Sequence, residues 1–222
     1  MSVREPRYLV PFAALFAVTF IPRLVARYRL RQLMIAGEVD RILETWYPAI
    51  SRTSAADTLA PLMAATAYAA YGRVDSARAS MNRASYSAGW ENALEQRLFV
   101  EALLDSFEGD RTSANEKAEQ LEKLEIRGVG FFARRRIVQM RRGMTALTRA
   151  FSHRSLATDA ALLERAGESS PLIHWAMRYA SAIVAIDRGE PSRVRTLLAS
   201  APSWPVNSAF FDYHRELLGK AG

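Results

Sequence analysis

Four glycines recur along this chain at intervals that an array of helix pairs would produce. They are Gly37, Gly72, Gly109 and Gly189, and the intervals between them are 35, 37 and 80 residues. The longest interval is about two units of 40 residues, so one unit lacks its glycine and is expected to turn near residues 151–155. A fixed period of this size is typical of stacked repeats, in which each unit packs on its neighbours.

Small or aliphatic residues keep fixed distances from these glycines. Glycine reaches the positive φ that ends many helices, and small side chains let the two helices of a pair approach closely. Five residues after the glycines stand Ile42, Ala77, Ala114 and Val194; seven residues before them stand Leu30, Ala65, Ala102 and Ala182. No stretch alternates polar and apolar residues over a strand length, so we expect an all-α fold without a sheet.

The pattern resembles the tetratricopeptide repeat over roughly residues 23–205. The unit at residues 58–91 carries the best match, through Ala65, Tyr68, Gly72, Asp75, Ala77, Met81 and Ala84. The resemblance implies a right-handed α-solenoid of about five helix pairs, and residues 208–220 are expected to form a terminal capping helix. A generic α-helical bundle is the alternative.

Three departures from the family pattern stand out. Gly89 occupies the position of the family's late proline, and Asp105 stands where the family prefers an aromatic residue. The unit at residues 131–167 lacks the turn glycine.

An apolar segment precedes the repeats. Residues 8–22 contain no charge and a single polar side chain, Thr19. Extended to Ala26, a helix of this segment would be about 28 Å long, close to the roughly 30 Å hydrocarbon core of a bilayer. We therefore predict a single transmembrane anchor at residues 1–26 and a helical-repeat domain at residues 27–222. A core helix beneath the first repeat and a cleaved signal peptide are the alternatives, although no small-residue cleavage site follows the apolar run.

Most of the net charge of +7 flanks this segment. Four arginines follow the apolar run, whereas the preceding residues carry two arginines and Glu5. By the positive-inside rule, the repeat domain is expected on the cytoplasmic side of the membrane.

The sequence contains few candidates for catalytic or metal-binding residues. The chain contains no cysteine, and its three histidines stand far apart, without neighbours at metal-ligand spacing. Nucleophile, phosphate-binding and dinucleotide motifs are also missing from the sequence. We therefore expect no enzymatic activity, no metal and no cofactor.

The family resemblance implies that a protein or peptide partner lies in a concave groove formed by the first helix of each unit. The corresponding groove residues here are largely apolar. They are Leu62, Thr66, Gln96, Phe99, Leu103, Tyr179 and Ile183. Leu62 and Phe99 replace the cations with which some relatives clamp a chaperone's terminal carboxylate, which disfavours such a partner. The resulting hypothesis is a membrane-anchored scaffold that binds a protein through an apolar groove.

Two neighbouring charge blocks suggest an alternative. Residues 91–125 carry ten acidic and four basic side chains, whereas residues 126–158 carry eight arginines and no acid. The blocks either neutralise each other across a unit boundary, or the arginines bind an anionic partner such as an acidic protein, a phospholipid or a nucleic acid. Arg135, Arg142 and Arg149 are spaced by seven and share a helix face. Aromatic residues do not interleave with the arginines of residues 133–150, which disfavours nucleic acid.

Overall fold

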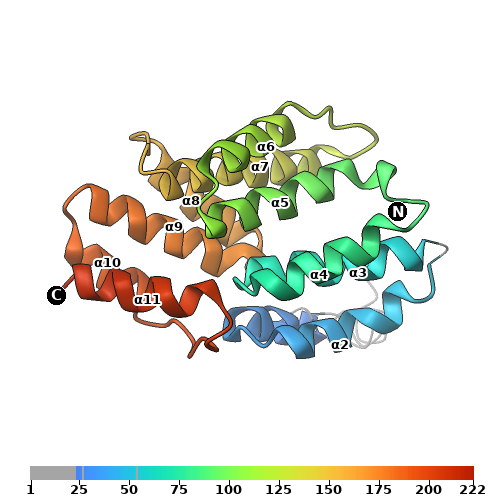
Figure 1. Cartoon of the computed structure of the whole chain (residues 1–222), viewed down its shortest axis with the longest axis horizontal. Helices are drawn as coiled ribbons and strands as arrows, with labels where there is room; N and C mark the ends of the chain where they lie inside the picture. Colours follow the sequence, from blue (N-terminus) through green and yellow to red (C-terminus); the bar gives the residue numbers. More distant parts are fainter. Residues whose placement is uncertain (1–23, 27, 54) are drawn as a thin grey trace, which may run out of the picture.

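The computed structural model describes residues 24–26, 28–53 and 55–222, and every regular element in that part of the chain is helical (Figure 1). The helices are α2 (Val39–Ile50), α3 (Ala56–Ala70), α4 (Val74–Ser85), η2 (Glu91–Ala93), α5 (Leu94–Glu108), α6 (Arg111–Lys123), α7 (Phe131–Phe151), α8 (Asp159–Ser169), η3 (Pro171–Ile173), α9 (His174–Asp187), α10 (Pro191–Leu198) and α11 (Ala209–Lys220). Residues 28–36 are also helical and lead into α2. The all-α prediction is confirmed.

The predicted turn glycines each separate the two helices of a pair. Gly37, Gly72, Gly109 and Gly189 all have positive φ angles, between +70° and +85°. In the fourth pair the corresponding turn is made by His153, whose φ is +55°. This left-handed residue lies inside the interval where the repeat spacing predicts a turn, so the phase of the helix pairs is confirmed.

The helices of each pair meet through the small residues that the spacing predicts. Ala65, Ala77, Ala102 and Ala114 are all buried, as is Val194. Because their side chains are short or compact, they allow close contact between helices.

The fourth pair achieves the same close approach by different means. A Cβ atom added to Gly143 of α7 would lie 2.3 Å from the Cβ of Ala166 in α8. In this pair the left-handed turn residue is His153, and Gly143 provides the close contact between the helices.

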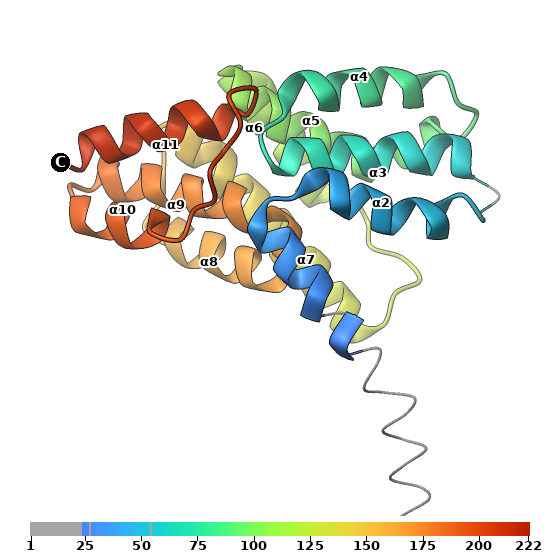
Figure 2. The ribbon, with the colours of Figure 1, turned by 90° about the horizontal axis from the view of Figure 1, so that it is seen from below.

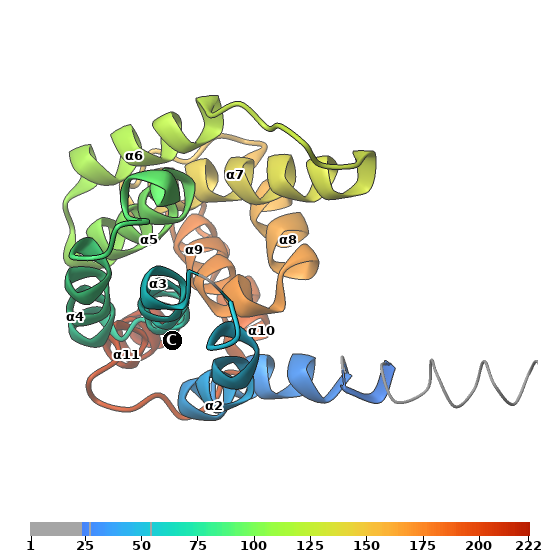
Figure 3. The same cartoon turned by 90° about the vertical axis from the view of Figure 1, so that its right-hand side faces the viewer.

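The pairs form a closed array in which the last pair contacts the first. Helices α3, α5, α7 and α9 contact one another in succession, and η3, directly before α9, also contacts α3. The indole Nε1 of Trp175 in α9 donates a hydrogen bond to the carbonyl of Ile35, 2.7 Å away. Figure 3 shows α3, α5 and α9 near the centre, with α2, α4, α6 and α8 further out. The closed arrangement differs from the open concave groove that the family resemblance implies.

The C-terminal segment stabilises the closed array by binding to the first and second pairs (Figure 2). The Ser208 hydroxyl donates to the carbonyl of Tyr71 at 2.7 Å, and the Ala209 amide donates to the carbonyl of Gly72 at 2.8 Å. The backbone of Gly37 packs against the ring of Trp204. Ser208 also caps α11, which begins one residue later, so the predicted C-terminal capping helix is confirmed.

The predicted membrane anchor falls almost entirely on residues 1–23, which lie outside the described part of the chain. Of the helices that the structure does describe, none combines the length and the hydrophobicity needed to cross a bilayer.

Candidate binding cavity

Five of the seven predicted groove residues, Phe99 among them, belong to the hydrophobic core. Leu62, Leu103, Tyr179 and Ile183 are buried in the centre of the array. The ring of Tyr179 stacks on Phe210 with a centroid distance of 4.6 Å. The C-terminal segment thus covers Tyr179, and a partner would have to displace that segment to reach this side chain.

Phe99 and the two polar predicted residues meet at a cavity. Thr66, Gln96 and Phe99 line a hollow of about 550 Å³ at the opposite end of the array. Its volume lies within the range of about 300–1,000 Å³ that is common for binding pockets. Figure 3 views the molecule from the side on which α3 and α5 begin, which is the side of this cavity.

Five segments of the chain supply the walls. They are α3 with the residue before it, Gly89 with η2, the first half of α5, the middle of α7, and η3 with the residue before it. Besides the three residues above, the lining consists of Ala55, Thr58, Leu59, Gly89, Asn92, Ala93, Glu95, Met140, Ser170, Leu172 and Ile173. The lining is mainly apolar, with a few hydrogen-bonding groups, which is the composition of most ligand sites in proteins.

The polar lining groups are held by hydrogen bonds. Gln96 Nε2 donates to Thr66 Oγ1 at 2.9 Å, and that hydroxyl donates to the carbonyl of Leu62 at 2.7 Å. Glu95 pairs with Arg141 of α7 at 2.9 Å. Because Arg141 is only 2% exposed, this pair fixes α7 against α5 beside the cavity.

Gly89 shapes one wall. A Cβ atom at this position would lie 2.6 Å from Oγ1 of Thr58 in α3. The glycine therefore lets the segment before η2 lie directly against α3. In the sequence, Gly89 stands where the repeat pattern has a proline, and this departure is a signal for the cavity wall in addition to the predicted groove positions.

The three predicted arginines of the anionic-partner patch are in different environments. Arg149 forms two hydrogen bonds with the buried carboxylate of Asp159, at 3.0 and 2.6 Å, and these raise the pKa of its guanidinium. Arg142 lies 3.9 Å from Glu122, whereas Arg135 is exposed beside a second hollow between α7 and α8. The expected single stripe is therefore divided, because Arg149 is engaged within its own helix pair.

Some of the charge complementarity between the two blocks is satisfied across the unit boundary. Arg127 pairs with Glu125, Arg141 binds Glu95 and Arg142 approaches Glu122, so three arginines of residues 126–158 meet acids of residues 91–125. The exposed Arg134, Arg135 and Arg136 form no ion pair within the described part of the chain. Internal packing thus accounts for only part of the arginine cluster.

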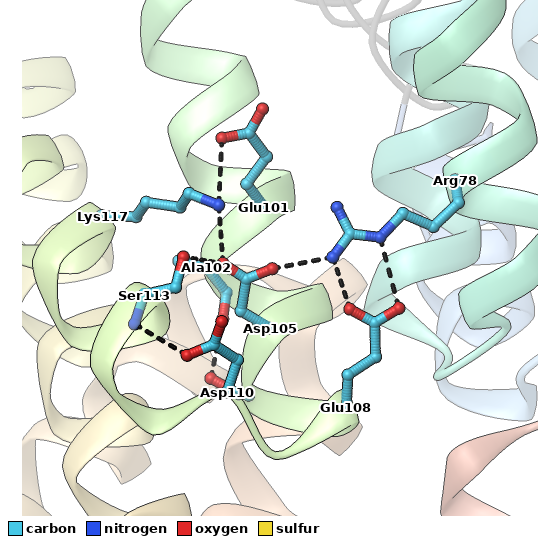
Figure 4. A network of polar contacts seen from close by, with 9 residues as sticks. Arg78, Glu101, Ala102, Asp105, Glu108, Asp110, Ser113 and Lys117 are labelled. Carbon is cyan, nitrogen blue, oxygen red and sulfur yellow. Dashed lines mark hydrogen bonds and ion pairs between the residues drawn. The ribbon is translucent and has the colours of Figure 1, made fainter.

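Asp105 is the centre of a polar network between neighbouring pairs (Figure 4). Its carboxylate accepts hydrogen bonds from Arg78 of α4 at 2.7 Å, Lys117 of α6 at 2.6 Å and the Ser113 hydroxyl at 2.7 Å. Burial alone would raise the pKa of Asp105, but these hydrogen bonds outweigh it and lower the pKa. An ionised aspartate thus joins two units at the position where the family pattern has an aromatic residue.

No family model matches the sequence, and no curated protein or solved structure matches it. The relation to the tetratricopeptide repeat therefore stays a prediction that is based on the residues quoted above.

Proposed function

We propose that this chain is a non-enzymatic helical-repeat scaffold that binds an apolar segment of a protein partner in the cavity between α3, α5, α7 and η3. The observation that carries this proposal is the cavity itself, a mainly apolar hollow of about 550 Å³. Three of its lining residues are groove positions implied by the repeat pattern.

The lining supports a polypeptide as the occupant. Apolar side chains such as Phe99, Leu172 and Ile173 offer contacts for apolar partner side chains. The amides of Asn92 and Gln96 add hydrogen-bonding groups that match the N–H and C=O groups of a peptide backbone. The lining acid, Glu95, is neutralised by Arg141, so the cavity favours an uncharged segment.

We further propose that the segment at residues 1–26 holds this scaffold at a membrane, with the repeat domain on the cytoplasmic side. The support for this part of the proposal is the uncharged run of residues 8–22 and the arginines that follow it.

Filling the cavity should weaken peptide binding. We expect peptides selected from a displayed library against the chain to share a cluster of apolar residues, and to lose about 10- to 100-fold in affinity for the Ala93→Phe variant. The loss corresponds to the burial of one large apolar side chain, worth about 1.5–3 kcal/mol. Titration calorimetry with the selected peptides measures the affinities.

Ala79→Phe is the matched control, because Ala79 is exposed on α4, outside the cavity lining. It should leave the affinity unchanged. Selected peptides that bind the Ala93→Phe and Ala79→Phe variants equally well would show that the cavity is not the binding site.

A second candidate function is binding of an anionic partner through the arginines of α7. The observation that favours it is the exposure of Arg134, Arg135 and Arg136 on one turn of that helix.

A further inference from the structure

The beginning of α7 carries an exposed apolar tip. Phe131 and Phe132 are 75% and 81% exposed, and their rings contact each other edge to face with a centroid distance of 5.6 Å. Val129, just before the helix, is also exposed. A cluster of large apolar side chains in water is unfavourable unless another surface covers it.

Arginines surround this tip. Arg134, Arg135 and Arg136 follow the two phenylalanines after one alanine and are exposed. Arg134, Arg135, Arg142 and Arg165 line a hollow of about 350 Å³ between α7 and α8. Its apolar wall includes Phe131 and Leu162. Aromatic side chains flanked by arginines are typical of protein surfaces at a membrane–water interface.

The tip of α7 lies on the same side of the molecule as the N-terminal end of the described chain. Figure 3 shows that α7 and the helix that leads into α2 begin on the same side of the molecule, with α8 between the two helices. The exposed Leu24, Val25 and Tyr28 mark the beginning of that second helix. In the sequence, the apolar residues 8–22 stand directly before it.

We propose that the tip of α7, residues 129–136, docks on the surface of an anionic phospholipid membrane. Val129, Phe131 and Phe132 enter the interfacial region, while Arg134, Arg135 and Arg136 contact lipid phosphates. The hollow between α7 and α8 receives a further headgroup among Arg135, Arg142 and Arg165. The proposal goes beyond the cavity and rests on the proposed function only for the side of the molecule that faces the membrane.

A single reporter tests this docking directly. Because the chain has no cysteine, Val129→Cys in the full-length protein can be labelled uniquely with an environment-sensitive fluorophore. We expect a blue-shifted emission, and quenching by headgroup spin-labelled lipid, in vesicles of phosphatidylcholine and phosphatidylserine. The same label at Val206→Cys, an exposed site in the loop before α11, should stay in water.

A second variant tests whether the docking requires the charges of the three arginines. Replacing Arg134, Arg135 and Arg136 by glutamine should remove the blue shift at residue 129. The population of the docked state should fall by about five-fold for each arginine. Phosphatidylcholine alone should give a smaller shift for the unsubstituted tip. Circular dichroism checks that the helices of each labelled protein are retained.

Co-sedimentation separates the docking of α7 from the membrane anchor. The docking would be overturned if the label at residue 129 stayed as water-exposed as the label at residue 206 in the presence of phosphatidylserine. If the same chain still sedimented with phosphatidylcholine vesicles, the anchor would be retained. In that case an acidic protein would be the expected partner of the arginines. Blue shift and quenching at residue 129 in phosphatidylserine vesicles, without sedimentation on phosphatidylcholine, would support the docking and count against the anchor.

Discussion

Trp204→Ala should reduce the free energy of unfolding by about 3–5 kcal/mol, the usual cost of removing a large buried aromatic side chain. The indole Nε1 of Trp204 donates a hydrogen bond to the Tyr179 hydroxyl at 2.7 Å, and its ring lies 5.0 Å from that of Phe210 between ring centroids. The same ring contacts Tyr71 and the Gly37 turn, so its loss loosens the first, second and last pairs together. Urea denaturation measures the effect.

Two further substitutions make this prediction specific. Trp204→Phe retains an aromatic ring but loses the hydrogen bond to Tyr179, and should cost less than Trp204→Ala. Val206→Ala, in the same loop at an exposed position, should change stability by no more than about 0.5 kcal/mol. Equal stability of the Trp204→Ala and Val206→Ala variants would contradict the closed array.

Asp105→Ala is expected to cost on the order of 3 kcal/mol, because it removes one partner of a buried ionic network. Asp105 is 4% exposed and binds Arg78, Lys117 and Ser113, which come from the two helices that flank α5. The cationic partners are less deeply buried than the aspartate, and each keeps a second acid, so the cost lies at the lower end of the range for buried pairs. Thermal or chemical denaturation at neutral pH gives the difference.

The contribution of Asp105 should depend on pH in a defined direction. Its pKa is lowered by folding from an ordinary value of 3.8, so the folded state favours the ionised form. The resulting stabilisation is fully present above pH of about 4 and is lost as the pH falls through the lowered folded-state pKa. The stability difference between the wild-type protein and Asp105→Asn should therefore be largest near neutrality and shrink under acid conditions.

Glu119→Gln is the control for this experiment, because Glu119 forms an exposed pair with Lys123. It should change stability by less than about 1 kcal/mol. A difference between wild type and Asp105→Asn that grows on acidification would contradict the lowered pKa.

The helix pairs could be predicted from the sequence because their signals are local. A glycine that ends a helix and small residues at fixed offsets act within a single pair, so Gly72 and Ala77 indicate both the turn and the contact between the two helices. Even the pair without a turn glycine could be placed, since the spacing of its neighbours requires a turn near His153.

The closure of the array could not be predicted in the same way. It depends on contacts between residues more than 100 positions apart, such as Trp175 with Ile35 and Ser208 with Tyr71. In the sequence, residues 201–207 indicate only the end of the array. That Trp204 fills the interior is a consequence of the closed arrangement of the pairs.

Only part of the cavity lining could be predicted from the sequence, because the rest depends on the closure of the array. Thr66, Gln96 and Phe99 could be found because they occupy repeat positions on α3 and α5. Met140 and Ser170 belong to segments whose position depends on closure, and no periodic pattern marks them. Likewise, the pairing of Arg149 with Asp159 depends on how the long turn between α7 and α8 folds back.

Site-directed photocrosslinking at the rim of the cavity tests the central claim most directly. A photoreactive phenylalanine analogue at Asn92, which lines the cavity and is solvent-exposed, should form a discrete adduct with a polypeptide in native membranes. The same analogue at the exposed Tyr86, outside the cavity, should not form this adduct. We predict that Ala93→Phe eliminates the adduct at residue 92 and Ala79→Phe preserves it. An adduct of equal yield from residues 92 and 86, or one that survives the filling of the cavity, would contradict the account.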